Sequence, residues 1–524
     1  MKSYFVSLNK GTTIIFAALA GAVIFWFGSQ SGAGNMGESS SSGRETGSLS
    51  RGEAFFRYSP PVKLARLANE WEPQEALLLS IAFPESMGNR DIARYQIQLL
   101  EVAHQYLDIY VFCEQEQERA FAYFLSLIER HPQADSILAK THFIDSRPLL
   151  RWIRDYGPIW GFNRDKELVG IDFVYRQPLK ELEVETLKGD DAYRDFLALQ
   201  GDAMPADVVS TLQSEYDTPI RIVRPPLSMD GGDFVSDGRG NAFVSTNTLT
   251  RNGGNKEEVQ KLFQKYFGVK KLHVLNALPG ATVRHLDMIF KFVDYETVLL
   301  PEYQEYTGDL INPYRIELNR KIRTTIEKNE RYLRKHFPNY RILKVPMPPL
   351  LLSPRNDVIT EAKQEFIKVV ALERELLSRD RIDTLGSADL VELEKQVVAL
   401  IQRETPTANF KTSEGFNAIL RDYGQMPLET IVDLHAEPVT RYRSYINSLF
   451  VNSKEGKQAF ILPRFSSTHS AEAARLKEWE ATTEKVYREA WPNAAVHWIN
   501  CDSMVSDMGF IHCSTITVPS APFN

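Results

Sequence analysis

The sequence predicts an α/β fold, because segments typical of strands alternate with segments typical of helices along the chain. Residues 76–82 are apolar except for Ser80, as expected of a buried strand, and residues 107–113, apolar except for Asp108, are strand-like as well. Between them, residues 91–105 place apolar side chains three and four positions apart, which is the spacing of an amphipathic helix. With 524 residues, the chain is long enough to bury a substantial hydrophobic core.

Composition excludes several classes of protein. The chain carries 61 Lys and Arg against 68 Asp and Glu, which gives a formal net charge of −7. A protein that binds nucleic acid without regard to sequence needs a basic face, so we expect no nucleic-acid partner. The three cysteines, Cys113, Cys501 and Cys513, are too few for a disulfide framework, and none has the paired spacing of a zinc or redox site. We therefore expect no metal.

The first 52 residues have the pattern of an export segment followed by a tether. Lys2 and Lys10 precede an uncharged, mostly apolar run at residues 11–28, whose length is near the lower limit for spanning a bilayer. We interpret residues 1–28 as a signal peptide or a signal anchor, so that the membrane is a partner only if this segment is not cleaved. Residues 29–52 are rich in Ser and Gly and indicate a flexible linker. The domain at 53–524 is then expected outside the cytoplasm, periplasmic or secreted.

The composition changes again at about residues 356–404. Charged residues are frequent there, and apolar residues recur at three- and four-residue steps on both sides of a break at 386–387. This pattern predicts two amphipathic helices whose charges face solvent. Further along the chain, residues 471–490 indicate a helix and residues 495–499 a strand, which continues the α/β alternation.

Four short segments contain residues able to do chemistry: 151–158, 229–234, 284–290 and 507–515. Taken singly, they have ordinary structural explanations. The Arg-Asp neighbours of the first are typical of a surface ion pair, the glycine pair of the second is typical of a hairpin, and a lone cysteine such as Cys513 is typical of core filling.

The third segment is the least ordinary of the four. His285 and Asp287 alternate with the apolar residues Leu286 and Met288, which predicts a strand. On a strand both polar side chains point to the same side, about 6–7 Å apart. Two ionisable groups on one strand face among apolar neighbours are unusual and favour a functional site over a plain structural pair.

Taken together, the four segments point to one kind of chemistry. A thiol with a distant His and Asp supplies a nucleophile, a base and an orienting group. A cysteine protease has the same inventory, but it has no need of several carboxylates near its sulfur. Anions near a thiol raise its pKa and are costly unless a cation shares the site. A guanidinium group is such a cation, planar, always charged and matched to carboxylates by forked hydrogen bonds.

Seven motifs then occur in order along about 450 residues: EWEPQEA at 70–76, WIRDYGP at 152–158, DGGDFVSDGRG at 230–240, RHLDMIFKFVD at 284–294, SYINSLFVN at 444–452, ILPRF at 461–465 and GFIHCST at 509–515. With these motifs the chain resembles the agmatine deiminases and bacterial-type peptidyl-arginine deiminases of the guanidine-modifying (pentein) superfamily. The resemblance implies a five-bladed propeller of ββαβ modules around a central active site. Relative to the family, residues 350–440 look like a helical insertion.

The resemblance also implies a reaction and the residues that perform it. Cys513 is then the nucleophile, and His285 protonates the departing ammonia and afterwards activates water. Asp155 and Asp287 hold the guanidinium nitrogens. The substrate is a small-molecule or peptidyl guanidino compound, which is hydrolysed to a ureido product and ammonia through a covalent amidino-cysteine intermediate. No metal or organic cofactor is implied.

Other residues of the motifs are expected to contact the substrate: Trp152, Asp230, Gly231 and Asn447. Trp152 would line the pocket by stacking on the cation. His512 belongs to the last motif, but neighbours on a strand face opposite sides, so we expect it to pack or to support the site rather than to take part in catalysis.

The chain departs from the family pattern in two motifs. Gly509 is what remains of a glycine-rich run before the nucleophile, and residues 230–233 read Asp-Gly-Gly-Asp where the family often has Glu-Gly-Gly-Asn. Agmatine, free arginine and peptidyl-arginine therefore stay open as substrates, although an extracytoplasmic location favours peptidyl-arginine or scavenged guanidines. The alternatives to deimination are a non-catalytic module that binds arginine-bearing ligands, an amidinotransferase and a protease. The sequence does not indicate an oligomeric state.

Overall fold

The computed structural model describes residues 58–520 with gaps at 84–89, 147, 149, 176–189, 282, 305–312, 354–363, 365, 369, 373, 379–380, 382–384, 386, 405–438, 468–469 and 507–508. The chain divides into two compact units, which are described separately. The larger unit comprises Ser48–Ala82, Tyr95–Leu350 and Tyr442–Asn524, and the smaller one contains Phe83–Arg94 and Leu351–Arg441. All candidate site residues named above belong to the larger unit.

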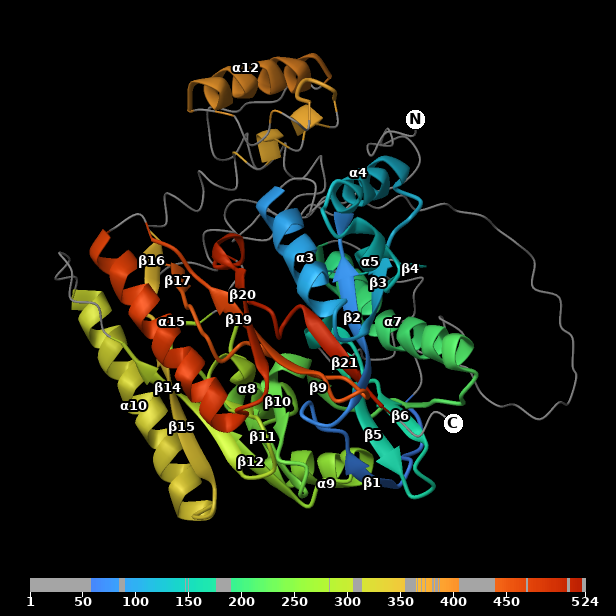
Figure 1. Cartoon of the computed structure of the whole chain (residues 1–524), viewed down its shortest axis with the longest axis vertical. Helices are drawn as coiled ribbons and strands as arrows, with labels where there is room; N and C mark the ends of the chain where they lie inside the picture. Colours follow the sequence, from blue (N-terminus) through green and yellow to red (C-terminus); the bar gives the residue numbers. More distant parts are fainter. Residues whose placement is uncertain are drawn as a thin grey trace, which may run out of the picture. The chain divides into compact units, whose positions relative to one another are not determined.

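Within the described residues, five sheets of the larger unit share one strand order (Figure 1). In each sheet two antiparallel strands are followed by a third strand that runs parallel to the second. The five sets are β5 (Ile159–Asn163), β6 (Leu168–Ile171) and β8 (Arg221–Val223); β10 (Phe234–Ser236), β11 (Asn241–Ser245) and β12 (Lys271–Leu275); β13 (Lys291–Phe292), β14 (Thr297–Tyr303) and β15 (Arg341–Met347); β18 (Leu449–Asn452), β19 (Gln458–Arg464) and β20 (Ala495–Asn500); and β21 (Thr515–Pro519), β2 (Gln74–Ile81) and β3 (Asp108–Cys113).

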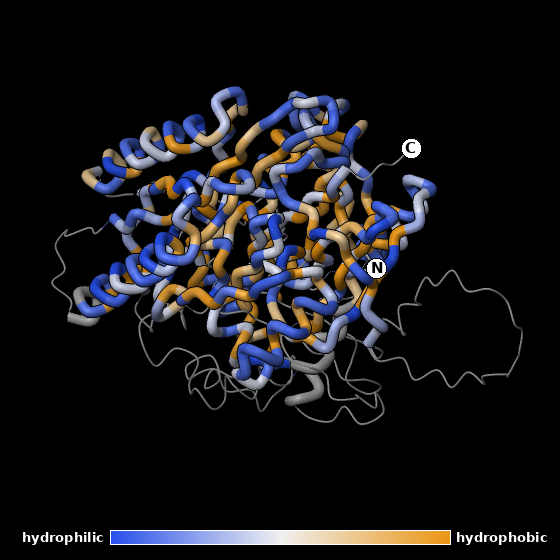
Figure 2. Tube along the Cα trace, turned by 90° about the horizontal axis from the view of Figure 1, so that it is seen from below, coloured by the Kyte–Doolittle hydropathy of each residue, from blue (hydrophilic) through white to orange (hydrophobic). Residues whose placement is uncertain are grey.

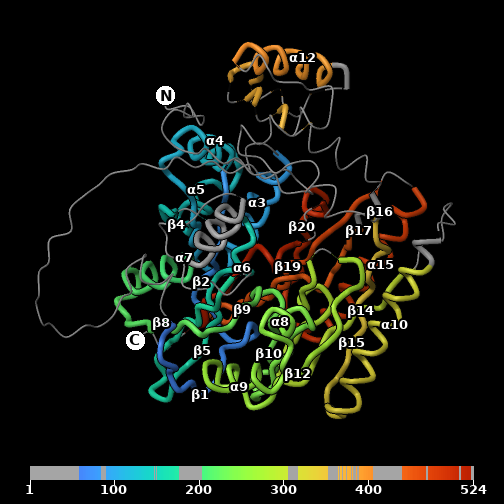
Figure 3. Tube along the Cα trace, turned by 180° about the vertical axis from the view of Figure 1, so that it is seen from behind, coloured from blue at the N-terminus to red at the C-terminus, as the bar shows by residue number. Residues whose placement is uncertain are grey.

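Helices connect the second strand of each set to the third. They are α7 (Asp190–Tyr216), α8 (Thr246–Arg251) with α9 (Lys256–Phe267), α10 (Pro313–His336), α15 (Ser470–Ala490) and α3 (Arg90–Ala103). A parallel pair needs such a crossover, because the chain must return to the starting edge of the sheet. Helix α15 packs against β15 and α10 against β14, while the view from behind in Figure 3 shows α9 beside β1 (Leu64–Leu67) and β12.

Further elements extend these sheets or lie between them. Strand β1 pairs with β5, and β4 (Thr141–Asp145) pairs with β3. The short strands β7 (Val174–Tyr175) and β9 (Ser228–Met229) pair with each other, and the short helices α4 (Glu118–Glu129), α5 (Ala134–Leu138) and α6 (Ile153–Tyr156) lie in the connections. Because β21 pairs with β2, the last and the first motifs of the chain meet in one sheet.

Local sequence explains why these elements begin and end where they do. All eight residues of β2 are buried, as a central strand between two neighbours requires. Helix α9 begins after Asn255, whose side chain accepts the N–H groups of Glu257 and Glu258. It ends at Gly268, which adopts the left-handed conformation (φ 66°) that glycine tolerates best.

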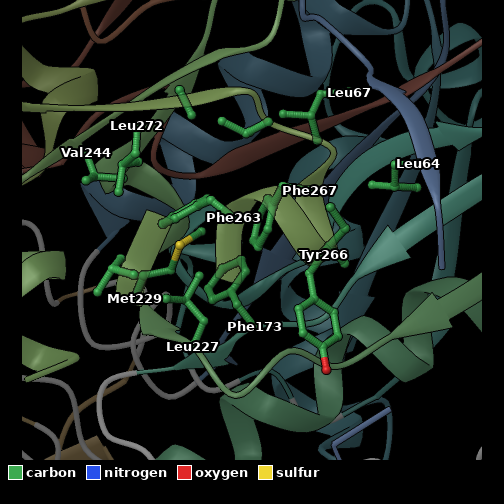
Figure 4. Packing of buried hydrophobic residues seen from close by; sticks show 14 of the residues in the cluster. Leu64, Leu67, Phe173, Leu227, Met229, Val244, Phe263, Tyr266, Phe267 and Leu272 are labelled. Carbon is green, nitrogen blue, oxygen red and sulfur yellow. The ribbon is translucent and has the colours of Figure 1, made fainter. Parts of the chain in front are cut away.

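A hydrophobic cluster in the larger unit supports β9, the strand that leads to the candidate residue Asp230. Phe263 and Phe267 of α9, with ring centroids 4.7 Å apart, pack there with residues of β1, β6, β9 and β11 (Figure 4). Met229, which immediately precedes Asp230, is fully buried in this cluster. In Figure 2 the apolar residues likewise concentrate on interior segments. Burial of Met229 therefore holds the end of β9 and fixes where Asp230 starts its turn.

The structure confirms most of the elements expected from the sequence and corrects three. The strands at 76–82, 107–113 and 495–499 and the helices at 91–105 and 471–490 are present, with ends shifted by a few residues. The strand expected at 284–290 is wrong, because Leu286–Met288 form a short 3-10 helix, η3, and β13 begins only at Lys291. Leu286, Asp287 and Met288 are all buried, so the alternation of polar and apolar residues did not separate a core face from a solvent face.

The other two corrections concern turns. Gly231–Asp233 form a second 3-10 turn, η2, rather than a hairpin, and the hairpin turn lies at 237–240 between β10 and β11. Residues 511–514 form a turn before β21, so His512 and Cys513 are not neighbours on a strand. A turn lets both side chains approach the same group, which a strand forbids.

The smaller unit contains part of the expected helical insertion. Strand β16 (Leu351–Ser353) pairs antiparallel with β17 (Val439–Arg441), and α12 (Ser387–Glu404) matches the second of the two expected helices. Much of the first expected helix, the apolar run at 11–28 and the linker at 29–52 lie outside the described residues. Among the residues that are described, no helix combines the length and the apolarity needed to cross a membrane.

Candidate active site

Residues from five of the sequence motifs meet around the thiol of Cys513. Cys513 lies in the turn before β21, His285 precedes η3, and Asp287 lies within η3. Asp230 precedes η2, Asn447 lies in the loop before β18, and Asp155 lies in α6. None of these six residues lies in a strand, and the turns, loops and short helix that carry them aim their side chains at one point.

The thiol of Cys513 is buried, with 2% of the residue exposed. Its Sγ lies 3.3 Å from Oδ2 of Asp287 and accepts a hydrogen bond from Nδ2 of Asn447 at 3.1 Å. Burial and the Asp287 carboxylate raise the pKa of the Cys513 thiol to about 12. The hydrogen bond to His285 lowers this pKa, but its effect is smaller. Without a further cation the sulfur is therefore a thiol at neutral pH.

His285 lies between two carboxylates. Its Nε2 is 2.9 Å from Oδ2 of Asp230, and its Nδ1 is 3.4 Å from Oδ1 of Asp155. Burial lowers the pKa of His285, but the Asp155 carboxylate, the Asp230 hydrogen bond and the Cys513 thiol outweigh it and hold the pKa well above its usual value. The ring is therefore protonated at neutral pH and is a proton donor.

Asp230 is fixed from behind by Arg251 of α8. The guanidinium donates from both terminal nitrogens, at 2.8 Å to Oδ1 and 2.7 Å to Oδ2 of Asp230. Burial opposes ionisation of Asp230, but hydrogen bonds and charges from His285 and Arg251 lower its pKa. Such a forked pair restricts the carboxylate to one orientation, and that orientation points Oδ2 at His285.

Asp287 has one oxygen bound within the protein and one that is not. Oδ2 accepts a hydrogen bond from Nδ1 of His512 at 2.7 Å and contacts the thiol of Cys513. Oδ1 is buried and has no hydrogen-bond partner among the residues that the structure describes. Burial opposes ionisation of Asp287, but His512 lowers its pKa, so a buried anionic acceptor is left beside the sulfur.

The two glycines of the DGGD motif have different surroundings. A Cβ atom at Gly232 would lie 2.7 Å from Nδ1 of His285, and within 3.1 Å of oxygens of both Asp155 and Asp287. A Cβ atom at Gly231 would instead lie 2.0 Å from the backbone oxygen of Arg154. Gly231 was the glycine expected at the substrate, but it is Gly232 that adjoins the three ionisable groups.

Trp152 immediately precedes α6, the helix that carries Asp155, and makes no capping side-chain hydrogen bond there. The guanidinium of Arg151 lies 5.0 Å from the centroid of the Trp152 ring. A Cβ atom at Gly509 would lie 2.7 Å from the same ring, so this glycine makes room for the indole. Trp152 thus contacts the motif that contains Cys513 as well as the segment that bears Asp155.

The other cysteines are buried and free, as expected for core residues. Burial raises the pKa of Cys113 to about 12, with a further contribution from Asp145, and it raises the pKa of Cys501 well above its usual value. No group of three or more His, Cys, Asp or Glu side chains in the described part of the chain is arranged to hold a metal ion.

Sequence reasoning missed several residues around the site. Arg251 lies in no motif, and no spacing connects it to Asp230. Glu70 is named in the sequence analysis only as the first residue of the EWEPQEA motif, yet its Oε1 lies 2.8 Å from Nε2 of His512. His512 also contacts Asp287, which its expected place on a strand had not suggested.

Comparison with known proteins gives a family and a fold. Residues 66–519 match the model of the Porphyromonas-type peptidyl-arginine deiminase family. A curated protein of Mycoplasma mycoides subsp. mycoides SC, named "Putative agmatine deiminase", is 24% identical over 215 residues, which is 37% of this chain and 54% of that protein. The chain thus spans about half the length of the curated relatives that it matches.

Two solved structures extend the likeness to most of the chain. An agmatine deiminase of C. jejuni has a TM-score of 0.51 and 15% identity, with 87% of this chain and 96% of that chain covered. An agmatine deiminase of Enterococcus faecalis has a TM-score of 0.52 and 16% identity, with 88% and 99% covered. At such identities the likeness shows a shared mixed α/β fold. Since the family model matches from residue 66 to residue 519, the chain belongs to the Porphyromonas-type peptidyl-arginine deiminase family.

Proposed function

We propose that this protein hydrolyses the guanidinium group of a small-molecule or peptidyl substrate to a ureido group and ammonium. The observation that carries the proposal is the buried Oδ1 of Asp287. This oxygen is an anionic acceptor with no hydrogen-bond partner among the described residues. The other oxygen of the same carboxylate, Oδ2, lies 3.3 Å from the sulfur of Cys513. A cationic N–H donor bound there brings its own carbon next to the sulfur. A guanidinium group is the donor that places an electrophilic carbon between its N–H groups.

Binding of the cation also explains how a thiol with a raised pKa becomes a nucleophile. The pKa of Cys513 is about 12 because the sulfur is buried beside a carboxylate. A guanidinium held by Asp155 and Asp287 adds a positive charge next to the sulfur and reverses that effect. The thiol then releases its proton to solvent, and the thiolate forms only when a substrate is present.

The first half of the reaction forms the covalent intermediate. The thiolate of Cys513 attacks the central guanidinium carbon, so that a C–S bond forms and one C=N bond becomes single. The neutral tetrahedral adduct then loses one nitrogen, which takes a proton from the His285 imidazolium and leaves as ammonia. An amidino group on Cys513 and a neutral His285 remain.

The second half consumes one water molecule. Neutral His285 removes a proton from water, and the hydroxide oxygen attacks the amidino carbon. The C–S bond then breaks, with its electron pair returning to sulfur, and the ureido product leaves. The hydroxyl proton of the adduct passes to solvent, where the ammonia released in the first half becomes ammonium. Asp230 supports both halves because its anion stabilises the protonated ring of His285.

The same proposal includes the finer architecture and the location. We infer that the five sheets with one repeated strand order are the blades of a pentein propeller, with Leu351–Arg441 as an insertion. Peptidyl-arginine is the substrate favoured by the family's description, and agmatine is the one favoured by the names of the solved relatives. An export segment at 1–28 favours peptidyl-arginine or scavenged guanidines.

The test measures ammonia and ureido product from agmatine, free arginine and an arginyl peptide. Wild-type protein is expected to release both products from at least one of the three substrates, and Cys513→Ala to release neither. Cys113→Ala is the matched control, because it removes another buried thiol outside the site and is expected to keep activity. A folded wild-type protein that binds a substrate but releases no product would favour a binding module, and a new guanidino compound formed on an added amine would favour an amidinotransferase.

A further inference from the structure

A second layer of charged residues lies behind the catalytic residues. Arg154 and His512, the chain neighbours of Asp155 and Cys513, line a cavity of about 90 Å³ together with Glu70 and Lys291. The catalytic residues themselves are not among the residues that line this cavity. Helix α6 and the turn before β21 therefore each have one residue at the candidate active site and a chain neighbour that lines the rear cavity.

His512 connects the two sides. Its Nδ1 lies 2.7 Å from Oδ2 of Asp287, and its Nε2 lies 2.8 and 3.0 Å from the two oxygens of Glu70. The residue is 6% exposed, so little water competes for these contacts. Each ring nitrogen thus has a carboxylate as its partner.

Both carboxylates are ionised. Burial opposes ionisation of Glu70, but the charges of His512, Lys291 and Arg154 hold its pKa well below the usual value. Lys291 Nζ lies 3.1 Å from Oε2 of Glu70, and Arg154 Nη2 lies 2.7 Å from Oε1. Both ring nitrogens of His512 are thus engaged by ionised carboxylates, Nδ1 by Asp287 and Nε2 by Glu70, so the ring is held in one orientation.

The orientation of Asp287 follows from this arrangement. Oδ2 of Asp287 is occupied by His512 and by the thiol of Cys513, which leaves Oδ1 as the acceptor for a ligand. We propose that His512 is a positioning residue for deimination: its ring is held by Glu70 and fixes the Asp287 carboxylate with Oδ1 toward the substrate guanidinium. The proposal rests on the proposed function, because it assigns a role within that same site.

Removal of the ring predicts a defined change in the pH profile. Two elements bring titratable groups to Asp287: the turn before β21 brings His512 and Cys513, and the segment before η3 brings His285. Asn447 contacts the backbone oxygen of Asp287. His512→Ala removes the hydrogen bond that lowers the pKa of Asp287, so this pKa rises and a guanidinium is bound only at higher pH. We expect the acid limb of kcat/KM to move up by about one pH unit or more and kcat/KM at pH 7 to fall about 10- to 100-fold, with KM changed more than kcat.

Chemical rescue separates a hydrogen-bonding role from simple packing. The space vacated in His512→Ala adjoins the rear cavity, so added imidazole has a site there, and we expect it to restore kcat/KM several-fold. His273→Ala is the matched control, because His273 is equally buried but bonds to Tyr332 and Asn241 away from the site. Imidazole is expected to leave that variant unchanged. A folded His512→Ala protein with the wild-type acid limb and no rescue would overturn the proposal.

Glu70→Gln tests the contact between Glu70 and Nε2 of His512. A neutral amide holds Nε2 of His512 less firmly than a carboxylate, so the acid limb is expected to shift in the same direction as in His512→Ala but by less. Glu72→Gln is the control, since Glu72 bonds to Arg66, Asn69 and Tyr295 and does not contact His512. Equal pH profiles for the two variants would contradict the assigned role of Glu70.

A measurement without turnover keeps this inference separate from the proposed function. In the Cys513→Ala protein, the dissociation constant of agmatine, measured by calorimetry, is expected to rise about 10-fold or more when His512→Ala is added. An unchanged dissociation constant would refute the proposal whatever the activity of the wild-type protein. A raised dissociation constant in a protein that releases no ammonia from any substrate would support the positioning role and refute deimination.

Discussion

Asn447 donates its side-chain N–H group to the sulfur of Cys513 at 3.1 Å, while its side-chain oxygen accepts the backbone N–H of Phe510 at 3.1 Å. The amide therefore fixes the turn that carries the nucleophile and also supplies a donor to the sulfur. A donor stabilises the thiolate more than the thiol. Asn447→Ala is expected to raise the pKa of Cys513 further and to lower kcat about 100-fold, which initial rates of ammonia release will measure.

Two further variants separate the donor from the packing. Asn447→Asp keeps the shape but places an anion beside the sulfur, so it is expected to lose more activity than Asn447→Ala. Asn452→Ala is the control, because Asn452 is also buried and bonds to the backbone of Trp71, away from the thiol. Its effect is expected on the melting temperature and not on kcat. Full activity in Asn447→Asp would contradict a role as donor to the thiolate.

The pH range of activity is expected to depend on Asp230. His285 acts first as an acid and must be protonated, so a raised pKa extends activity to higher pH. Burial lowers this pKa, and Asp155 and Asp230 raise it above the usual value. Asp230→Asn removes one of the two anions, so the pKa of His285 falls and the alkaline limb of the kcat profile moves down by about 1–2 pH units.

The control for Asp230→Asn is a carboxylate outside the site. Asp237 is buried and accepts hydrogen bonds from Tyr340 and Asn241, without contact to His285. Asp237→Asn is expected to lower stability and to leave the alkaline limb unchanged. If the alkaline limb of the kcat profile is the same in both variants as in the wild-type protein, His285 is not the acid that determines this limb.

Labelling of the thiol is expected to depend on the charge of the reagent. The pKa of Cys513 is raised to about 12 in the absence of ligand, so a neutral haloacetamide should react slowly at pH 7. A haloacetamidine of the same size carries an amidinium cation, which Asp287 binds beside the sulfur. We expect it to react about 100-fold faster or more, and mass spectrometry to place the adduct on Cys513. Equal rates for the two reagents, or labelling spread over all three cysteines, would contradict activation by a cation.

Sequence reasoning selected the proposed reacting groups because each of them lies in a short motif. Cys513, His285 and Asp287 stand beside glycine or apolar residues in patterns that an ordinary surface does not require. The structure brings them together, even though the strand expected around His285 is a 3-10 turn. Their convergence did not depend on that strand, since the turn also aims His285 and Asp287 at one point.

The supporting contacts had no comparable pattern in the sequence. Arg251 reaches Asp230 because α8 packs against β9 and β11, and nothing in the spacing of the two residues indicates this contact. Glu70 and His512 are 442 positions apart and meet because β21 pairs with β2. Contacts of this kind follow from the closure of the fold, which local periodicity does not reveal.

Gly232 is expected to be essential for activity although no side chain acts there. A Cβ atom at this position would lie 2.7 Å from Nδ1 of His285, 3.0 Å from Oδ1 of Asp155 and 3.1 Å from Oδ2 of Asp287. Gly232→Ala must therefore displace several of these groups, and a misplacement of about 1 Å is enough to lower kcat/KM about 100-fold. Gly253→Ala is the control: it has positive φ but nothing within 4 Å, so it is expected to cost about 1–2 kcal/mol of stability and no activity. Kinetics and thermal melts of both variants decide the matter, and a fully active Gly232→Ala enzyme would show that these three groups do not act together.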